Sequence, residues 1–329
     1  MVKRLKLNKF LSVIALCCLA GCEQNNQNTS SIDRLVSSIN EGNISVVAPS
    51  SWLDDAESKT IQAKYPTLWD KIHFQYNEKY KYLSNTNEQR FYFLKHALDN
   101  KASSVIWALR GGYGAERIIP YLLNIQKPTV HKWLIGYSDI TALHLFVSQV
   151  WGWKSIHGAV AKETVYSTED PKNFIYLEKI LSGTAKAITY QGLKLLSGNK
   201  PIQSIKGKLT GGNTALISTS VGTPWQFNAK DKIVIIEESG YGYRIDRVLQ
   251  HLKNTKVLAG AIAIIIGDII AWDADAKLII NDFIKDLAVP VFKTDIFGHG
   301  SKNYPWIYNA KASITPDQDG GYQLTFYIN

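Results

Sequence analysis

The strongest constraint on the fold is an alternation of short apolar runs with a helical segment in the first half of the chain. The apolar runs 44–49 and 105–109 have the length of buried strands and end in turn residues. Between them, residues 87–100 repeat apolar side chains with the period of a helix. A strand, a helix and a second strand in this order predict a parallel sheet, because parallel neighbours need a crossover connection.

The loops after three predicted strands should meet at one edge of this sheet. Open parallel sheets bind ligands beyond the carboxyl ends of their strands. Pro49-Ser50, Gly111-Gly112 and Ser138 all follow such strands. We therefore expect these three loops to converge on one cleft.

Ser138 lies between the apolar run 133–135 and a predicted amphipathic helix, 140–150. A strand that turns sharply into a helix can expose a nucleophile and aim the next backbone N–H at a developing oxyanion. Ser followed by Asp is also a good helix N-cap, and Ile140 stands where a lipase-like elbow has its second glycine. Taken alone, the segment favours the cap.

The second half of the chain predicts a further set of short strands. The runs 233–236, 261–266 and 289–292 are bounded by turn residues, and 245–252 is helical between two of them. We expect a two-domain α/β protein. Its N-terminal parallel-sheet domain carries a nucleophile at a strand-turn-helix, and its C-terminal domain is smaller and mostly β. The expected boundaries are 43–165 for the first domain, 166–205 for an interdomain linker and 206–329 for the second domain.

The N-terminus predicts an export signal with a lipid anchor. Basic residues precede an apolar stretch, 10–19, which is shorter than the roughly 20 residues that a membrane-spanning helix needs. Leu19-Ala20-Gly21-Cys22 then predicts cleavage after residue 21 and acylation of Cys22. The signal would be 1–21, and 22–42 would be mainly a flexible tether, with a helical segment at 32–39. The expected location is a bacterial membrane, facing the periplasm or the outside, and Glu23 favours the outer membrane.

Composition argues against several functional classes. Cys17 and Cys18 would leave with the signal, so no cysteine would remain for a catalytic thiol or a disulfide. The formal charge of +9 falls to +5 with the signal's four basic residues, and the sequence has no basic stripe that would predict nucleic-acid binding. No His-Glu-x-x-His motif or cysteine cluster predicts a metal or another cofactor.

Five segments together resemble the LD-carboxypeptidase family, which includes murein tetrapeptide carboxypeptidases and microcin-immunity peptidases. The segments are Arg110-Gly111-Gly112-Tyr113-Gly114, Gly136-Tyr137-Ser138-Asp139, Leu209-Thr210-Gly211-Gly212-Asn213, Ile236-Glu237-Glu238-Ser239 with Tyr243-Arg244-Ile245-Asp246-Arg247, and Gly298-His299-Gly300. Their order and spacing match over nearly the whole chain beyond residue 40.

The resemblance implies a serine nucleophile at Ser138, a base at His299 and an acidic member at Glu237. The backbone N–H groups of Gly112 and Asp139 would form the oxyanion hole. Glu238 replaces the usual Asp of the family motif, which leaves open whether Glu237 or Glu238 orients the histidine. Successive side chains at a strand end point to opposite faces, so only one can reach His299.

Several further side chains are candidates for substrate binding. Arg110 and Arg244 could hold the carboxylate of a terminal D-alanine, although an ion pair is as good an explanation for Arg244. Asn213 and His157 could line the pocket, whereas His144 is expected to be structural.

The resemblance implies a serine LD-carboxypeptidase that removes the terminal D-alanine of murein tetrapeptides. Two alternatives remain at this point: an immunity-type hydrolase of peptide-nucleotide antibiotics, and a non-catalytic murein-binding lipoprotein. The expected partners are a murein peptide, a membrane through the anchor and a second copy in a homodimer. Neither nucleic acid nor a cofactor is expected.

Overall fold

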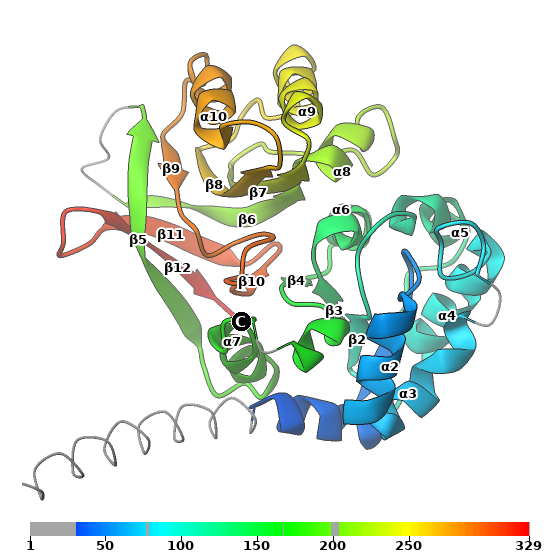
Figure 1. Cartoon of the computed structure of the whole chain (residues 1–329). Coiled ribbons are helices and arrows are strands. Elements are labelled where there is room, and N and C mark those ends of the chain that lie inside the picture. The colour runs from blue at the N-terminus through cyan, green and yellow to red at the C-terminus, as the bar shows by residue number, and fades with distance from the viewer. Residues whose placement is uncertain (1–30, 77–78, 167, 199–203, 329) are drawn as a thin grey trace, which may run out of the picture.

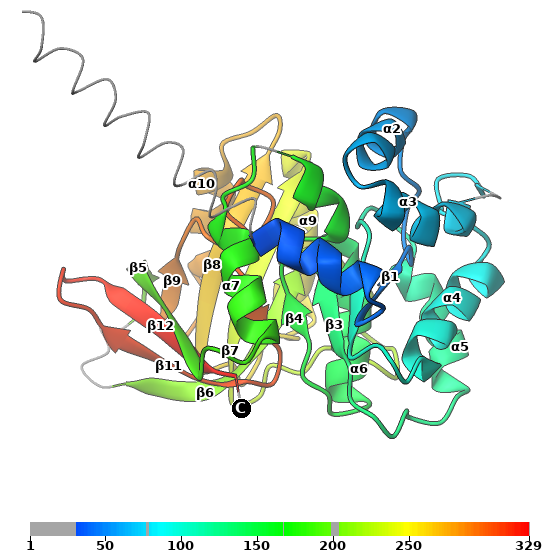
Figure 2. The same cartoon turned by 90° about the horizontal axis from the view of Figure 1, so that it is seen from below.

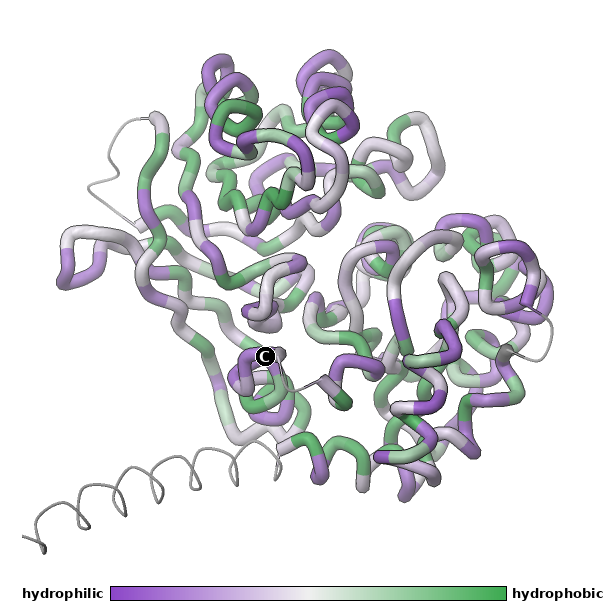
Figure 3. Tube along the Cα trace, viewed as in Figure 1, coloured by the Kyte–Doolittle hydropathy of each residue, from purple (hydrophilic) through white to green (hydrophobic). Residues whose placement is uncertain are grey.

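The computed structural model describes residues 31–76, 79–166, 168–198 and 204–328, and these form two parts that lie side by side (Figure 1). A five-stranded sheet belongs to the first part, and a closed seven-stranded barrel belongs to the second. Figure 3 shows hydrophobic residues along the strands of both parts, with hydrophilic residues on the outer helices. The predicted α/β class with a parallel sheet and a second sheet is confirmed.

The first sheet has the strand order β1-β2-β3-β4-β10. Its strands are β1 (Ile44–Val47), β2 (Val105–Ala108), β3 (Trp133–Gly136), β4 (Ile156–His157) and β10 (Trp306–Ile307). The first four are parallel, as the strand-helix-strand pattern predicts. The fifth pairs antiparallel with β4 and comes from near the C-terminus, so the end of the chain ties the two parts together.

Helices cover both faces of this sheet (Figure 2). They are α2 (Asp55–Lys64), α3 (Pro66–Ile72), α4 (Asn87–Asp99), α5 (Ile119–Leu123) and α6 (Thr141–Gln149). Every residue from Thr141 to Ser148 of α6 is buried, because this helix also packs against the second part through β6 and α8. The helix predicted at 140–150 is therefore buried all round rather than amphipathic.

The barrel has the order β11-β12-β5-β9-β8-β7-β6. Its strands are β5 (Ala187–Ser197), β6 (Ile205–Asn213), β7 (Lys232–Gly240), β8 (Ala263–Ala271), β9 (Val291–Lys293), β11 (Lys311–Pro316) and β12 (Tyr322–Tyr327). Strands β6 to β9 are parallel, and the other pairings are antiparallel. Three helices, α8 (Thr214–Thr219), α9 (Gly242–Asn254) and α10 (Ala276–Ile284), pack on its parallel strands.

The expected linker, 166–205, is largely structured in the described residues. It contains α7 (Lys172–Leu181) and β5, and β5 pairs with β9 and β12 in the barrel. Its polar composition hid a sparse set of apolar residues that is enough for one buried face. Residues 31–40 form a helix that buries Leu35 and Ile39, which agrees with the helical segment expected at 32–39. Within the described ranges, no helix is both long enough and apolar enough to cross a membrane.

Candidate active site

Ser138 lies in a tight turn between β3 and α6. It opens a short 3-10 helix, Ser138–Ile140, and its φ is 60°, in the left-handed region. A residue with a Cβ avoids this region at a cost of about 1–2 kcal/mol. Strain of this kind is typical of a nucleophile elbow, which lifts the side chain away from the sheet. The hydroxyl does not cap α6, so the N-cap interpretation does not account for Ser138.

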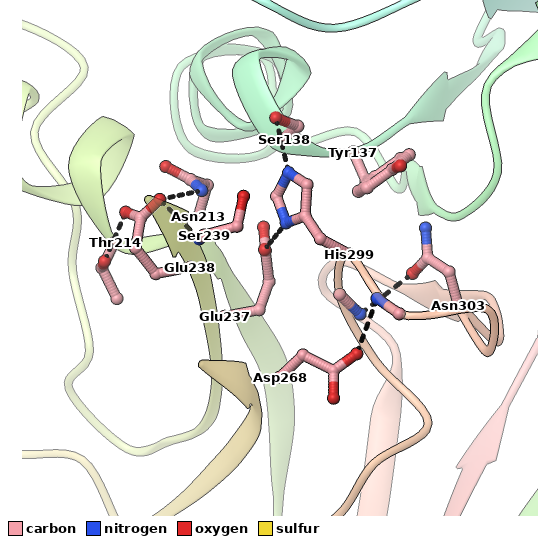
Figure 4. A network of polar contacts seen from close by, with 12 residues as sticks. Tyr137, Ser138, Asn213, Thr214, Glu237, Glu238, Ser239, Asp268, His299 and Asn303 are labelled. Carbon is pink, nitrogen blue, oxygen red and sulfur yellow. Dashed lines mark hydrogen bonds and ion pairs between the residues drawn. The ribbon is translucent and has the colours of Figure 1, made fainter. Parts of the chain in front are cut away.

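Three side chains from both parts of the molecule form a continuous polar chain (Figure 4). Ser138 Oγ lies 3.0 Å from Nε2 of His299. Nδ1 of the same ring lies 2.7 Å from Oε2 of Glu237. Glu237 is fully buried, whereas His299 keeps 21% of its side-chain surface exposed. A hydroxyl, an imidazole and a buried carboxylate in this order can activate the hydroxyl as a nucleophile.

The charge state of His299 is set by two opposing effects. Burial lowers the pKa of the imidazole, but the charge and hydrogen bonding of Glu237, aided by Glu238 and Glu163, raise it to about 9. The carboxylate beside Nδ1 thus stabilises the imidazolium that would form when His299 takes the Ser138 proton. It also keeps much of the free ring protonated at neutral pH.

The two neighbouring glutamates of β7 have separate partners. Glu237 faces His299, and Glu238 accepts hydrogen bonds from Asn213 Nδ2 (3.0 Å), Thr214 Oγ1 (2.7 Å) and the Ala215 N–H (2.8 Å). Burial raises the pKa of Glu238, with the charge of Glu237 as the next contribution. Glu238 thereby ties the start of α8 to β7. The geometry answers the open question between the two residues in favour of Glu237.

The loop that carries His299 packs against strands β7 and β8 of the barrel. Gly298 has φ 127°, and a Cβ there would lie 3.0 Å from the Cβ atoms of both Glu237 and Asp268. Only glycine allows this approach. On the other side of the histidine, the Gly300 N–H donates to Asp268 Oδ2 over 2.8 Å (Figure 4). Asp268 therefore fixes the loop without touching the imidazole.

A cavity of about 640 Å³ opens over Ser138 and His299. Gly112 and Asp139 line it, as does Asn213 at the end of β6. Gly112 has φ 109°, and a Cβ there would lie 2.4 Å from the Ser51 hydroxyl, so the loop needs glycine where it passes the Ser51 side chain. The Asp139 carboxylate accepts the Ala115 N–H over 2.8 Å and joins the two loops.

Arg110 lines the same cavity beside a shared carboxylate. Its Nη1 donates to Trp52 O (2.6 Å) and lies 3.2 Å from Glu57 Oε2. Lys162 Nζ lies 2.5 Å from the other oxygen of Glu57. Two cations thus face one carboxylate, and the buried Nε of Arg110 has no hydrogen-bond partner among the described residues. This corner of the cavity can accept a further negative charge.

Two predicted substrate-binding residues lie outside the cavity lining. Arg244 is exposed on α9, with its guanidinium over the rings of Tyr241 and Tyr243 at 5.5 and 5.7 Å. His157 is fully buried in β4, where its ring stacks on Trp306 at 5.0 Å. A strand position between two layers explains its burial. His144 is also buried and contacts Ser155 Oγ and Gly136 O, as expected for a structural residue.

Sequence reasoning missed several residues that shape the cavity. Arg90 is buried on α4 and donates to Pro49 O, Asn85 O and Gly114 O, so it ties together the loops after β1 and β2. The Tyr137 hydroxyl donates to Glu163 over 2.6 Å, and its ring lies 5.1 Å from that of His299. Only Tyr137 had a signal, its place in the Ser138 motif. Arg90 belongs to a helix whose partners only the fold reveals.

Two further sequence predictions concern metal binding and lipid attachment. The described ranges contain no cluster of three or more His, Cys, Asp or Glu side chains placed to hold a metal ion. Cys22, the predicted acylation site, lies outside the described residues.

Comparison with known proteins identifies the family. A model of the LD-carboxypeptidase N-terminal domain matches residues 44–158, and a model of the C-terminal domain matches residues 206–314. This chain belongs to the LD-carboxypeptidase family. The two matches span the sheet with the Ser138 turn and most of the barrel with Glu237 and His299.

Relatives in this family come from several bacteria. A Rickettsia prowazekii protein provisionally named a carboxypeptidase is 44% identical over 75% of this chain and 78% of its own length. A Pseudomonas aeruginosa murein tetrapeptide carboxypeptidase is 28% identical over 83% of this chain and 93% of its own.

Two kinds of solved structure share the fold. A muramoyltetrapeptide carboxypeptidase from Oxalobacter formigenes superposes with a TM-score of 0.71 at 19% identity, covering 86% of this chain and 98% of its own. A microcin C7 self-immunity protein in complex with aspartyl sulfamoyl adenosine gives 0.70 at 17% identity, covering 86% and 95%. At these identities the likeness speaks for the fold alone.

Proposed function

We propose that this chain is a serine LD-carboxypeptidase that removes the terminal D-alanine from murein tetrapeptides. The observation that carries the proposal is the chain of contacts from Ser138 through His299 to Glu237 at the base of a cavity. His299 takes the Ser138 proton as the hydroxyl attacks the carbonyl carbon before D-alanine, and then donates it to the leaving amine. Water releases the acyl group from Ser138 in the second half of the reaction.

The proposed oxyanion donors are the backbone N–H groups of Gly112 and Asp139. Both residues line the cavity with Ser138, and Asp139 directly follows it in the turn. Removing one such donor in a serine peptidase costs about 10²–10³ in kcat.

Arg110 is the proposed anchor for the free carboxylate of D-alanine. Its place in the cavity lining and the two cations that share the Glu57 carboxylate support this role. Amidation of the tetrapeptide's C-terminus removes the charge. Hydrogen bonds to charged groups contribute roughly 1.5–3 kcal/mol, so kcat/KM should fall about tenfold or more. Equal cleavage of free and amidated peptides would show that the enzyme does not recognise the terminal carboxylate.

A second candidate function is hydrolysis of a peptide-nucleotide antibiotic. Trp272 lines the cavity with 65% of its surface exposed, and Tyr241 packs against it edge-on at 5.2 Å. An exposed indole at a cavity mouth can stack on a nucleobase. The microcin immunity structures give this candidate its precedent in the fold.

Mass spectrometry of reaction products separates the candidates. Purified protein should release D-alanine from free tetrapeptide and leave pentapeptide intact. Cleavage of an aminoacyl sulfamoyl adenosine, with no release from tetrapeptide, would favour the second candidate. If neither substrate is cleaved but the protein sediments with wall sacculi, the non-catalytic alternative holds.

A further inference from the structure

Five lysines border a second cavity, of about 620 Å³, on the outside of the barrel. They are Lys206, Lys208, Lys230, Lys232 and Lys311. Asp231 is the single acidic residue of the described lining. None of the three barrel strands involved carries a basic run in the sequence; the cluster arises because β6, β7 and β11 are neighbours.

The strand register places lysines directly opposite one another. Lys208 on β6 pairs with Lys311 on β11 on one side and with Lys232 on β7 on the other. Adjacent strands are about 4.8 Å apart, so three ammonium-bearing side chains start from one short row. Lys206 lies two residues before Lys208 and so shares its face. Like charges opposite one another destabilise a sheet.

This repulsion is not relieved by acidic side chains. Of the ion pairs in the described part of the chain, none includes any of the five lysines. Burial lowers the pKa of Lys232, and the charge of Lys208 adds to the effect. Burial likewise lowers the pKa of Lys154, with Lys208 and Lys311 as further causes. Five lysines beside the single carboxylate of Asp231 leave an excess of positive charge that attracts an anion.

The lysine cavity is remote from the catalytic cavity. Lys208 lies within β6 and Lys232 opens β7, whereas Asn213 and Glu237 lie five residues further along the same strands. At about 3.3 Å per residue, this separates the two levels by roughly 16 Å. A ligand bound here would therefore not touch Ser138 or its substrate.

We propose that this cavity binds a ligand with two or more phosphate groups. Five lysines and Asp231 leave a net charge of about +4, which a polyphosphate chain or several neighbouring phosphodiester headgroups can balance. Lysine binds phosphate as a point charge and needs no fixed planar geometry, which suits a row of flexible side chains. Phospholipid headgroups and a soluble polyphosphate chain both offer this chemistry.

Calorimetric titration with inorganic tripolyphosphate tests the proposal on the full chain. The wild type should bind saturably, and binding should weaken at higher salt because exposed charges are screened. Lys208→Gln removes the centre of the row and should weaken binding about tenfold or more. Lys101→Gln is the matched control, because Lys101 is exposed on the N-terminal part and takes part in none of the ion pairs among the described residues. It should bind as the wild type does.

A second arm identifies the source of the phosphate. Phosphatidylglycerol vesicles replace tripolyphosphate, with phosphatidylcholine vesicles as the uncharged reference. Tripolyphosphate binding that Lys208→Gln weakens about tenfold or more supports a soluble polyphosphate. Sensitivity to Lys208→Gln on phosphatidylglycerol vesicles alone supports lipid headgroups. Equal binding of both probes by wild type and Lys208→Gln, or no binding by the wild type, overturns the proposal.

Thermal unfolding with and without ligand distinguishes a role of Lys208 in ligand binding from a role in packing. Because Lys208→Gln relieves the repulsion, its Tm should equal or exceed that of the wild type, and tripolyphosphate should raise only the wild-type Tm. A lower Tm for Lys208→Gln, with no ligand effect on either protein, would show that Lys208 serves packing instead. D-alanine release should be the same in the wild type and in both lysine variants. The binding measurements therefore test the phosphate site separately from the proposed peptidase activity.

Discussion

Among single residues, Ser138 combines the strained backbone with the proposed chemistry. Ser138→Ala keeps the turn and removes the oxygen that contacts His299. Because members of a catalytic unit act together, kcat should fall about a thousandfold or more, with Tm nearly unchanged. D-alanine release measured by mass spectrometry, beside a thermal melt, checks this. A chelator should leave the wild type active; loss with chelator and recovery with zinc would contradict a serine mechanism.

His299 makes a second prediction, about pH. Its pKa of about 9 means that the free ring is largely protonated at neutral pH and becomes a base as the pH rises. We therefore expect kcat/KM to increase between pH 7 and 9. Glu237→Gln removes the charge that raises the pKa, so the rising limb should move to lower pH while kcat drops. A pH profile with the same limb in both proteins would show that another group titrates.

At the scale of structural elements, the loop between β9 and β10 positions His299. The Asp268 carboxylate at β8 receives the Gly300 N–H, and burial raises the pKa of that carboxyl. Asp268→Ala should lower kcat about tenfold with little change in KM, because a lost hydrogen bond of about 1–3 kcal/mol frees the loop. Asp268→Asn retains an acceptor oxygen and should restore most of kcat.

The control for this prediction is Asp295→Ala. Asp295 lies on the same approach to the loop but forms an exposed ion pair with Lys302. Pairs of this kind contribute little, so kcat should stay near the wild-type value. If Asp268→Ala raises KM and leaves kcat unchanged, Asp268 acts on substrate binding and not on the position of His299.

Elements also show what the sequence could and could not predict. The apolar runs 133–135 and 233–236 predict the strands that carry Ser138 and Glu237, so both residues could be proposed from the sequence. These strands, β3 and β7, belong to different sheets, so the contact between the two parts could not be predicted. The contact of His299 with Glu237 requires Gly298 to pass close to Glu237. The sequence does not show this approach, because it depends on how the folded loop packs. His157 has no sequence signal that separates a buried strand position from a cavity wall.

Over the whole molecule, cross-strand register limits sequence reasoning most. The lysine row exists because β6 pairs with both β7 and β11, and β11 follows β6 by about one hundred residues. Long-range pairing also explains why part of the expected linker is a strand, because β5 pairs with β9 and β12. A mild net positive charge was visible in composition, but its concentration on one face of the barrel required the closed topology.

The predicted export signal at the N-terminus bears on where the whole molecule resides. Leu19-Ala20-Gly21-Cys22 motivates a lipid anchor, and multiple acyl chains hold a protein on a membrane where one chain binds only marginally. Cys22→Ala should release the protein from membranes or block its processing, while purified protein keeps its turnover on soluble tetrapeptide. Fractionation and intact-mass analysis measure both. A processed Cys22→Ala protein that still sediments with membranes would rule out acylation as the anchor, and the lysine cavity would then become the next surface to test.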